Sequence, residues 1–577
     1  MSPISESAVR RPDRFNFATD VVDYWAAESP SLQAMLWVSQ DGAQQKSMTF
    51  QHFSRQSHRL SVLLESLGAR RGDVLMMILP RVPEWWEIAT AGLRSGIIIA
   101  PATTLLTPKE IEYRCRKSGA RIFVGDASSV RKLLTVRRNC PSLRTVIQVD
   151  GRAGAEVIDL AQALARIPSD AVHRSTPQCW NAPAILYFTS GTSGPPKIVV
   201  HNQVSYPLAH FLTGKHWLRL SPGKLCWNYT EQGWAKAAYS FFGAWTCGAS
   251  LFVWDDRQGF NAQSLLDILH RFPITNLCAP PLAWRQMVLQ PNQEYYRKHP
   301  PRALAHCTAA GEALNPSVIE QWRALSGLTI RDGYGQTEMI LLCGNYDGLA
   351  VRPGSMGKPI PGVPLRVINS AGEETAPGEE GDIAILLDGG EAGKQGDSRA
   401  STFFGIFDGY VSDDGRVVRP EQRYTGRDGV TRTWYLTGDK ATRDEDGYLW
   451  FVGRADDVIN SSGYRIGPFE VESTLKQHPA VVESAVVSSP DPVRGEVVKA
   501  FVVLTAPYLG RNADQLKREL QEFCKQHAAP YKYPRKIEFV RAEFLPRTVS
   551  GKIRRAELRK MEWQRRENRS GGPRAAL

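Results

Sequence analysis

The first 450 residues of this chain alternate short apolar runs with segments of helical periodicity, and this rhythm limits the possible folds more than any other feature. One stretch runs from an apolar segment at 74–79 through a helical segment at 84–93 to a second apolar segment at 96–100. The pattern repeats with 108–117 and 121–124. Strand-sized runs separated by helices predict β-α-β units in a largely parallel sheet. The expected fold class is therefore α/β.

The texture of the sequence changes after about residue 350, where Gly, Pro and Asp become frequent and the apolar runs shorten. This change predicts a β subdomain at about 350–453 inside a large N-terminal domain, 1–453. A small α+β pattern follows, with helices at 468–477 and 513–526 and strands at 481–488 and 497–505. We expect 454–562 to form a small C-terminal domain and the basic segment 563–577 to be a flexible tail.

Composition excludes several classes of protein. Apolar residues make up 42% and charged residues 23% of the 577 positions, as in soluble globular proteins. The 71 basic and 59 acidic residues leave a net charge of +12, which fits an anionic ligand or a basic surface without indicating a nucleic-acid binder. The sequence contains no run of 18 apolar residues, so no membrane span is expected. The nine cysteines contain no C-x-x-C pair, so neither a zinc cluster nor a redox pair is indicated.

The N-terminal sequence bears on the location of the protein. It contains no apolar segment of the secretory type. Arg10, Arg11 and Arg14, with nearby hydroxyl residues, resemble a mitochondrial presequence, whereas three acidic residues in the same region oppose that interpretation. The sparse cysteines indicate a reducing compartment. We expect a cytoplasmic protein, with the mitochondrial matrix as the alternative in a eukaryote.

The most informative segment is a loop of small and hydroxylated residues between apolar, β-branched runs at 185–188 and 198–200. The loop consists of Thr189, Ser190, Gly191, Thr192, Ser193 and Gly194. Small residues let backbone N–H groups converge on an anion, and the hydroxyls add further donors. Lys197 supplies a point charge for a phosphate. A Walker A loop would need its lysine at the start of a helix, whereas a strand follows Lys197, so a different phosphate loop is indicated.

Four further motifs follow the loop. They are Asp332-Gly-Tyr-Gly-Gln-Thr-Glu338, Tyr435-Leu-Thr-Gly-Asp439, Gly453-Arg-Ala-Asp-Asp-Val-Ile-Asn460 and Pro546-Arg-Thr-Val-Ser-Gly-Lys552. In this order they resemble the adenylate-forming, or AMP-binding, superfamily of acyl-CoA synthetases, carrier-protein-loading adenylation domains and luciferases. The resemblance covers about residues 25–562. It implies a large N-terminal domain followed by a small mobile C-terminal domain.

The resemblance implies an ATP site assembled from all five motifs. Besides the loop itself, the nucleotide-binding positions carried over are Lys197, Gly311, Glu312, Asp332, Gly333, Tyr334, Gly335, Gln336, Thr337, Asp439, Arg454 and Lys552. Lys197, Thr337 and Lys552 are the implied catalytic residues. Asp439 is expected to bind the ribose, because a carboxylate can accept hydrogen bonds from two hydroxyls. From the residues alone, a turn-capping role for Asp439 is an equal alternative.

Three residues carry further roles by resemblance. Glu338 is expected to hold Mg²⁺, which prefers oxygen ligands and nucleotide phosphates. Lys552, carried by a separate domain, can neutralise charge on the α-phosphate as a carboxylate attacks it. Asp456 is expected to be the hinge of that domain, because a polar junction beside Gly453 can absorb backbone rotation.

The C-terminal stretches 461–472, 489–499 and 531–536 resemble the medium-chain branch of the acyl-CoA synthetases, whose small domain binds coenzyme A. The positions carried over for coenzyme A are Ser462, Gly463, Tyr464, Arg494, Tyr533, Pro534 and Arg535. Arginines suit the phosphates of this cofactor because their planar fork binds phosphate at two points.

The acid substrate is expected to contact Trp234, Thr337 and Arg465 by the same resemblance. An aromatic stripe belongs more often to a core than to a pocket, and Trp234 is chosen because it matches a pocket tryptophan of the family. The motif around it reads Glu-Gln-Gly-Trp instead of Asp-x-Gly-Trp, and the segment 402–410 is also reshaped. These departures leave the chain-length preference open.

The resemblance therefore implies an ATP-dependent, AMP-forming acyl-CoA ligase that acts on a medium-chain fatty or aryl acid. Its implied partners are the carboxylic acid, ATP with Mg²⁺, and coenzyme A, with no nucleic acid; monomer and homodimer both remain open. One alternative is a ligase that loads a carrier protein, against which the coenzyme-binding arginines argue. A second is a non-catalytic acyl or nucleotide sensor, against which the intact Lys197, Glu338 and Lys552 argue.

Overall fold

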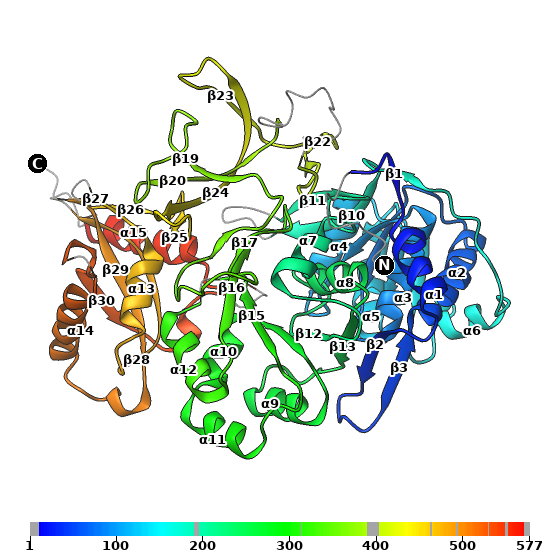
Figure 1. Cartoon of the computed structure of the whole chain (residues 1–577), viewed down its shortest axis with the longest axis horizontal. Helices are drawn as coiled ribbons and strands as arrows, with labels where there is room; N and C mark the ends of the chain where they lie inside the picture. Colours follow the sequence, from blue (N-terminus) through cyan, green and yellow to red (C-terminus); the bar gives the residue numbers. More distant parts are fainter. Residues whose placement is uncertain are drawn as a thin grey trace, which may run out of the picture.

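The computed structural model describes residues 11–189, 196–312, 314–388, 403–461, 464–491, 494–528, 530–548 and 552–570. Within them the chain forms two nine-stranded sheets, two five-stranded sheets and one short pairing of two strands (Figure 1). The short pairing joins β1 (Arg14–Phe15) to β9 (Gln178–Cys179). The mixed α/β architecture confirms the predicted fold class.

The first nine-stranded sheet has the order β22-β21-β11-β10-β5-β4-β6-β7-β8. Its strands are β4 (Val74–Ile78), β5 (Ile98–Pro101), β6 (Ile122–Gly125), β7 (Thr145–Gln148), β8 (Ile158–Asp159), β10 (Pro183–Thr189), β11 (Lys197–Asn202), β21 (Gly409–Val411) and β22 (Val417–Val418). The strands from β10 to β8 are all parallel, as the β-α-β rhythm predicts. The helices of this part are α1 (Tyr24–Glu28), α2 (Phe50–Ser66), α3 (Pro83–Ser95), α4 (Pro108–Ser118), α5 (Ala127–Leu134) and α6 (Leu160–Ala165).

Local sequence signals set the ends of these helices, and α4 is a clear case. The Thr107 hydroxyl accepts from the backbone N–H of Glu110, while the Glu110 carboxylate accepts from the N–H of Thr107. This reciprocal capping box is completed by Pro108, whose fixed φ suits the first helical position. The helix ends at Gly119, which adopts the left-handed φ of 66° that favours glycine.

The second nine-stranded sheet has the order β18-β17-β16-β15-β14-β12-β13-β2-β3. Its strands are β2 (Gln33–Val38), β3 (Gln45–Thr49), β12 (Leu225–Asn228), β13 (Ser250–Trp254), β14 (Asn276–Ala279), β15 (His306–Ala310), β16 (Ile330–Gly335), β17 (Leu341–Gly344) and β18 (Lys358–Pro359). Its central strands are parallel and its outer pairs antiparallel. The helices here are α7 (His210–Leu212), α8 (Ala237–Thr246), α9 (Ala262–Arg271), α10 (Pro281–Met287), α11 (Gln290–Lys298) and α12 (Pro316–Ser326).

An aromatic core joins the two large sheets. Phe17, Phe53 and Phe241 are buried against Trp245, with ring centroids 4.7–6.4 Å from it. Phe17 and Phe53 come from a segment about 190 to 230 residues before Trp245, so one apolar core holds both sheets together. The sheets therefore act as a common rigid frame for the loops at their edges.

The antiparallel part predicted for about 350–453 forms a five-stranded sheet. Its strands are β19 (Leu365–Ile368), β20 (Glu380–Leu386), β23 (Gln422–Thr425), β24 (Thr431–Arg443) and β25 (Leu449–Arg454). Within the same range, however, β18 pairs with the second large sheet, and β21 pairs with β11 of the first. The β21 segment thus crosses back to the strand that follows the predicted phosphate loop.

The C-terminal sheet has the order β27-β26-β29-β28, with β30 beside β29. Its elements are β26 (Ile459–Ser461), β27 (Tyr464–Ile466), β28 (Val481–Asp491), β29 (Gly495–Leu504), β30 (Lys536–Phe539), α13 (Pro468–Leu475), α14 (Ala513–His527) and α15 (Arg555–Ser570). Figure 1 shows this sheet beside the second large sheet, with α13 next to β25. In the described part of the chain, no helix combines the length and apolar character needed to cross a bilayer.

Candidate active site

The predicted phosphate loop connects two antiparallel strands. Thr189, at the end of β10, pairs with Lys197, at the start of β11. The strand after Lys197 is thus present as predicted, and the loop does not lead into a helix. The predicted loop positions Ser190, Gly191, Thr192, Ser193 and Gly194 lie outside the described residues. Lys197 is exposed, and its ammonium lies 5.0 Å from the ring centroid of Tyr410.

Tyr410 connects the phosphate loop to Glu338. Its hydroxyl donates a hydrogen bond of 2.7 Å to Oε1 of Glu338. The Phe407 N–H also donates to the Glu338 carbonyl, at 2.8 Å. Burial raises the pKa of Glu338, and the hydrogen bond from Tyr410 opposes this shift. Sequence reasoning placed Tyr410 in a reshaped segment but gave it no role.

The backbone carbonyl of Thr337 is held by two buried side chains. His201 Nε2 lies 2.8 Å from this oxygen, and the Tyr206 hydroxyl also donates to it. Because a carbonyl only accepts, Nε2 of His201 carries the proton, and Nδ1 accepts from Ser205 Oγ at 3.0 Å. Burial lowers the pKa of His201 to about 3, so the ring stays neutral at pH 7. Neither His201 nor Tyr206 was singled out from the sequence.

Asp439 is a buried carboxylate at the meeting point of three motifs. Its Oδ2 accepts from the Tyr334 hydroxyl and from Gln336 Nε2, both at 2.6 Å. Nε of Arg454 lies 3.5 Å from Oδ1. Burial raises the pKa of Asp439, and the charge of Arg454 opposes this effect. These contacts link the motif that ends at Glu338, the motif that ends at Asp439 and the motif that begins at Gly453.

The alternative of a turn-capping role for Asp439 is wrong, because Asp439 lies inside a strand. Strand β24 continues through it to Arg443. Opposite Asp382 and Ala384, the strand accommodates 437–439 as a bulge, with Gly438 at a φ of 74°. The bulge interrupts the regular strand pairing where Asp439 meets its partners, a feature that resembles a turn in sequence.

The turn after β15 carries Gly311 and Glu312. Gly311 has a φ of 111°, in the region that favours glycine. The carboxylate of Asp332 accepts from the backbone N–H groups of Leu314, at 3.1 Å, and Gly333, at 2.9 Å. Burial raises the pKa of Asp332 to about 7. Asp332, within β16, thus anchors the turn after β15.

Lys552 brings the last motif to this group. The Thr548 N–H donates to the Lys552 carbonyl at 2.8 Å, and Arg547 and Ile553 form an antiparallel bridge. Although its side chain is accessible to solvent, desolvation by the surrounding protein lowers the pKa of Lys552. The charges of Glu312 and Asp439 oppose this shift. The lysine therefore lies within electrostatic reach of residues from the large sheets.

The residues predicted for coenzyme A gather at one end of the C-terminal sheet. Ser461 of β26 pairs with Gly495 of β29, which brings the neighbouring Arg494 close to the end of β26. Tyr533 accepts from Arg535 at 2.7 Å, and the Pro534 carbonyl accepts from Gln521. Ser462 and Gly463, and the side chains of Tyr464 and Arg465, lie outside the described residues. Arg494 and Arg535 are both exposed at this end.

Trp234 lies on a tightly held loop before α8 and is half-buried. The loop rests on the backbone of the first large sheet, because a Cβ at Gly233 would lie 2.2 Å from the backbone nitrogen of Thr103. The carboxylate of Glu231 accepts from the Thr103 hydroxyl. Gln232, between them, is buried. The unusual Glu-Gln-Gly-Trp motif thus fixes the position of Trp234 relative to both sheets.

The donor set around Glu338 fits Mg²⁺ bound together with a nucleotide. Among the residues the structure describes, no group of three or more His, Cys, Asp or Glu side chains could enclose a metal by itself. Mg²⁺ commonly uses one or two carboxylates and completes its shell with phosphate oxygens and water. One carboxylate beside the phosphate loop meets that need.

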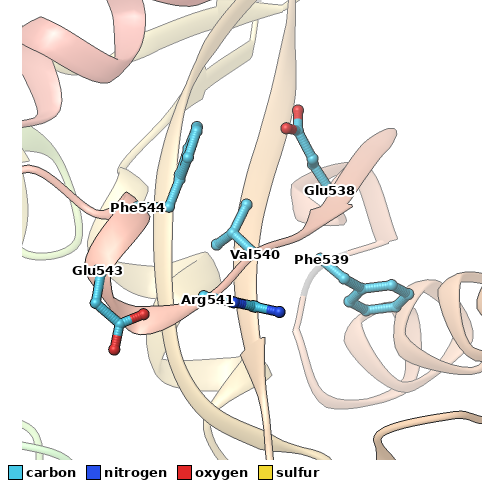
Figure 2. A pocket seen from close by; sticks show the side chains of 6 residues that line it. All are labelled: Glu538, Phe539, Val540, Arg541, Glu543 and Phe544. Atoms are coloured by element: carbon cyan, nitrogen blue, oxygen red, sulfur yellow. The ribbon is translucent and has the colours of Figure 1, made fainter.

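A separate concavity of about 660 Å³ lies on the C-terminal sheet, and Figure 2 shows its lining. It is lined by Glu538, Phe539, Val540, Arg541, Glu543 and Phe544. These side chains point in different directions from β30 and the turn after it (Figure 2). None of the predicted site residues contributes to it, so it is not the candidate active site.

Comparison with known proteins agrees with this geometry. The model of the AMP-binding enzyme family matches residues 22–388, and that of the AMP-binding enzyme C-terminal domain matches 470–552. The mitochondrial acyl-coenzyme A synthetase ACSM4 of Rattus norvegicus is 43% identical over 561 residues, which cover 96% of this chain and 92% of the relative. The mitochondrial acyl-coenzyme A synthetase ACSM5 of Homo sapiens is 41% identical over 558 residues, with 96% and 91% covered.

Solved structures show the same similarity. The anthranilate CoA ligase AuaEII, in complex with anthranoyl-AMP, has a TM-score of 0.80 at 27% identity, covering 96% of this chain and 99% of that one. An acyl-CoA synthetase of Brucella canis has a TM-score of 0.69 at 32% identity, covering 96% of each chain. A benzoate CoA ligase from Burkholderia xenovorans LB400 has a TM-score of 0.75 at 25% identity, with 94% and 100% covered.

Proposed function

This chain belongs to the AMP-binding enzyme family, and from that premise we propose that it is an ATP-dependent acyl-CoA synthetase. In the first step, a carboxylate oxygen of the acid attacks the α-phosphorus of ATP, and pyrophosphate leaves. In the second, the thiol of coenzyme A attacks the acyl carbonyl and releases AMP. The observation that carries the proposal is the presence of Lys552 within reach of Glu312 and Asp439.

The adenylation step depends on positioned charge. Lys197 and the preceding loop bind the phosphates of ATP, and Glu338 is the residue that would hold Mg²⁺, which neutralises phosphate charge when bound. Lys552 stabilises the negative charge that develops at the α-phosphate. Thr337, whose backbone carbonyl is held by His201, contacts the reacting groups in this mechanism. No covalent enzyme intermediate is needed.

The nucleoside is bound by the group around Asp439. The buried carboxylate binds the ribose hydroxyls, and the charge of Arg454 favours its ionised form against the effect of burial on its pKa. Tyr334 offers its ring to the adenine while its hydroxyl fixes Asp439. Asp439 already accepts hydrogen bonds from Tyr334 and Gln336. The ribose hydroxyls would replace or share these bonds, so the carboxylate is already oriented to accept from a diol.

The thioester step uses the end of the C-terminal sheet near Arg494 and Arg535. Their guanidinium groups bind the phosphates of coenzyme A, and Ser462, Gly463 and Tyr464 guide the pantetheine toward the acyl carbonyl. Lys552 is carried by the same C-terminal part of the chain. That part therefore rotates about Asp456 between the two steps and presents two different surfaces in turn.

The acid is a medium-chain fatty or aryl acid, bound against Trp234. The relatives named above include acyl-coenzyme A synthetases as well as anthranilate and benzoate CoA ligases. Both kinds of acid present an apolar body to an aromatic wall. In a eukaryote we place the enzyme in the mitochondrial matrix, as the names of the relatives suggest, and otherwise in the cytoplasm.

A panel of straight-chain, branched and aryl acids tests the proposal. Acid-dependent exchange between pyrophosphate and ATP, followed by AMP release that requires free coenzyme A, is the expected result. Exchange without thioester formation would favour a ligase for a carrier protein. The absence of exchange with every acid would favour a sensor and would overturn the proposal.

A further inference from the structure

Lys236 is a half-buried lysine that the proposed mechanism does not use. It immediately precedes α8, two residues after Trp234, on the loop that rests against the first large sheet. Its backbone carbonyl accepts from Asn228 Nδ2 at 2.8 Å, so the start of its side chain is fixed. The ammonium of a partly desolvated lysine needs a partner that compensates its positive charge.

The ammonium of Lys236 points at the turn that carries the predicted nucleotide residues. Nζ donates to the carbonyl of Ala310 at 3.4 Å, a long hydrogen bond. A Cβ at Gly311 would lie 2.7 Å from the same Nζ, so the absence of a side chain at Gly311 leaves the space that the ammonium occupies. Lys236 therefore reaches from the Trp234 loop to the edge of β15.

The charges around Lys236 are unbalanced. Glu312 is the carboxylate that acts on Lys236, and Arg285, Lys476 and Lys552 also act on Glu312, so Lys236 shares this counter-charge with three other cations. Arg285 is the nearest recorded ion-pair partner of Glu312, at 3.6 Å, so it already takes up part of that charge. The thiol of Cys278 also faces Lys236, but burial raises the pKa of this thiol, which keeps it neutral. Burial and the charge of Lys552 lower the pKa of Lys236 to about 8.

We propose that Lys236 binds the carboxylate of the acid substrate before adenylation and is thus a substrate-binding residue of the first half-reaction. A free carboxylate beside the ammonium of Lys236 gives this lysine a counter-charge of its own, because Glu312 already pairs with Arg285. The phosphates of ATP belong to the loop and Glu338, whereas Lys236 lies on the Trp234 loop, where the acid binds. This inference rests on the proposed function.

The two half-reactions should depend on Lys236 to different extents. The carboxylate carries its full charge only before it attacks the α-phosphorus, because one of its oxygens becomes the bridging oxygen of the acyl-adenylate. The contact with Lys236 is therefore strongest in the ground state, and its loss should raise KM for the acid more than it lowers kcat. Once the acyl-adenylate has formed, no free carboxylate remains for Lys236 to bind.

The test compares Lys236→Met and Lys236→Gln with the wild type, using octanoate or the acid preferred in the panel. A charge-assisted hydrogen bond is removed, so KM for the acid should rise about 10- to 100-fold in pyrophosphate exchange. KM for ATP, and thioester formation from preformed octanoyl-adenylate, should change less than about threefold, within ordinary mutational scatter. Lys236→Arg should recover part of the acid affinity because it keeps the charge.

Lys132→Met is the matched control, because Lys132 likewise donates to a backbone carbonyl, that of Thr104 at 2.8 Å, but on α5. Thioester formation from the preformed adenylate reports that each variant is folded. An unchanged KM for the acid in both Lys236→Met and Lys236→Gln would overturn the proposal, as would an equal rise in KM for ATP. A wild-type protein without acid-dependent exchange would instead contradict the proposed function itself.

Discussion

The hydroxyl of Tyr410 lies 2.7 Å from the carboxylate of Glu338, although 71 residues separate them along the chain. The contact exists because β21 returns to pair with β11, with Val199 opposite Tyr410. One aromatic side chain thus faces Lys197 with its ring and Glu338 with its hydroxyl. The proposed phosphate-binding cation and the proposed metal ligand therefore both contact the same residue.

Tyr410→Phe should weaken the use of Mg²⁺ without abolishing activity. The variant keeps the ring beside Lys197 and removes the hydrogen bond that favours the ionised form of Glu338. A hydrogen bond to a charged group contributes about 1.5–3 kcal/mol, so the Mg²⁺ concentration for half-maximal activity should rise about tenfold or more. A magnesium titration of acyl-adenylate formation measures this.

Tyr295→Phe is the control for that titration, since Tyr295 also donates to a carboxylate, Asp267, at 3.4 Å on the surface of α11. It should leave the magnesium dependence unchanged. If Tyr410→Phe behaved like this control, Glu338 would not depend on Tyr410 for its role.

Lys552→Ala should impair adenylation far more than thioester formation from a preformed acyl-adenylate. Its ammonium lies among Glu312, Asp439 and Arg454, where charge develops in the first step. Loss of one electrostatic stabiliser costs about 10²–10³ in rate. Single-turnover assays of each half-reaction measure the difference, with the exposed Lys560→Ala as control. Equal losses in both half-reactions would refute the assigned role.

Much of the fold can be predicted from periodicity and capping, because these signals are local. The predicted helix 513–526 corresponds to α14, Ala513–His527, and the predicted strand 481–488 lies within β28. The pairing of β21 with β11 depends instead on contacts between distant segments. A three-residue strand such as β21 carries no periodicity from which its partner could be inferred.

The site shows the same division. Motifs that match a family, such as the one ending at Asp439, could be placed from sequence, but their mutual contacts could not. His201 and Tyr206 act through the carbonyl of Thr337, and a backbone contact leaves no pattern in the side-chain sequence. Lys236 becomes notable only when its burial and its charged neighbours are known.

Trp234→Ala should change the preferred acid while KM for ATP stays nearly constant. The indole is half-buried on a loop fixed by Gly233 and Glu231, so its removal opens space without releasing the loop. Longer or bulkier acids should gain relative to the best wild-type substrate, as measured by kcat/KM across the acid panel. Trp563→Ala, on α15, is the control. Thermal unfolding at ordinary temperature in Trp234→Ala alone would instead assign Trp234 to the core.

Buried His201 should make the protein less stable as the pH falls. Its pKa is about 3 in the folded state and about 6.5 when unfolded, so the unfolded state binds the extra proton between these values. The stability is fully present above pH 6.5 and is lost progressively as the pH falls toward 3. At pH 5 the loss of unfolding free energy relative to neutral pH amounts to about 2 kcal/mol.

Urea unfolding of the wild type and of His201→Gln at pH 5 and pH 7 measures this effect. Glutamine can still donate to the Thr337 carbonyl but does not titrate, so the variant should lose less stability between the two pH values. Identical pH dependence in the two proteins would show that His201 does not titrate on unfolding. Other titrating groups are common to both proteins and cancel in the comparison.

Substitutions at Asp456 test whether the C-terminal part rotates between the two half-reactions. Adenylation needs Lys552 at Asp439, as the present arrangement has it, whereas thioester formation needs the surface near Arg494 to face the acyl carbonyl. Arg559, on α15, donates to the Asp456 carbonyl at 2.6 Å and pairs with Asp457 at 3.0 Å. These contacts tie the chain just after the proposed hinge to the C-terminal part, so that part can rotate about Asp456 as one unit.

Asp456→Pro should therefore leave one half-reaction and abolish the other. Proline fixes φ near −65° and restricts the preceding residue, so the junction can no longer move between two backbone conformations. Asp456→Ala removes only the side chain and should keep both steps, which separates backbone rotation from loss of the carboxylate. Adenylation is measured by pyrophosphate exchange, and thioester formation is measured from preformed acyl-adenylate and coenzyme A. Because the arrangement in this structure brings Lys552 to the nucleotide residues, adenylation is the step expected to survive; near wild-type rates for both steps in Asp456→Pro would mean that the hinge lies elsewhere.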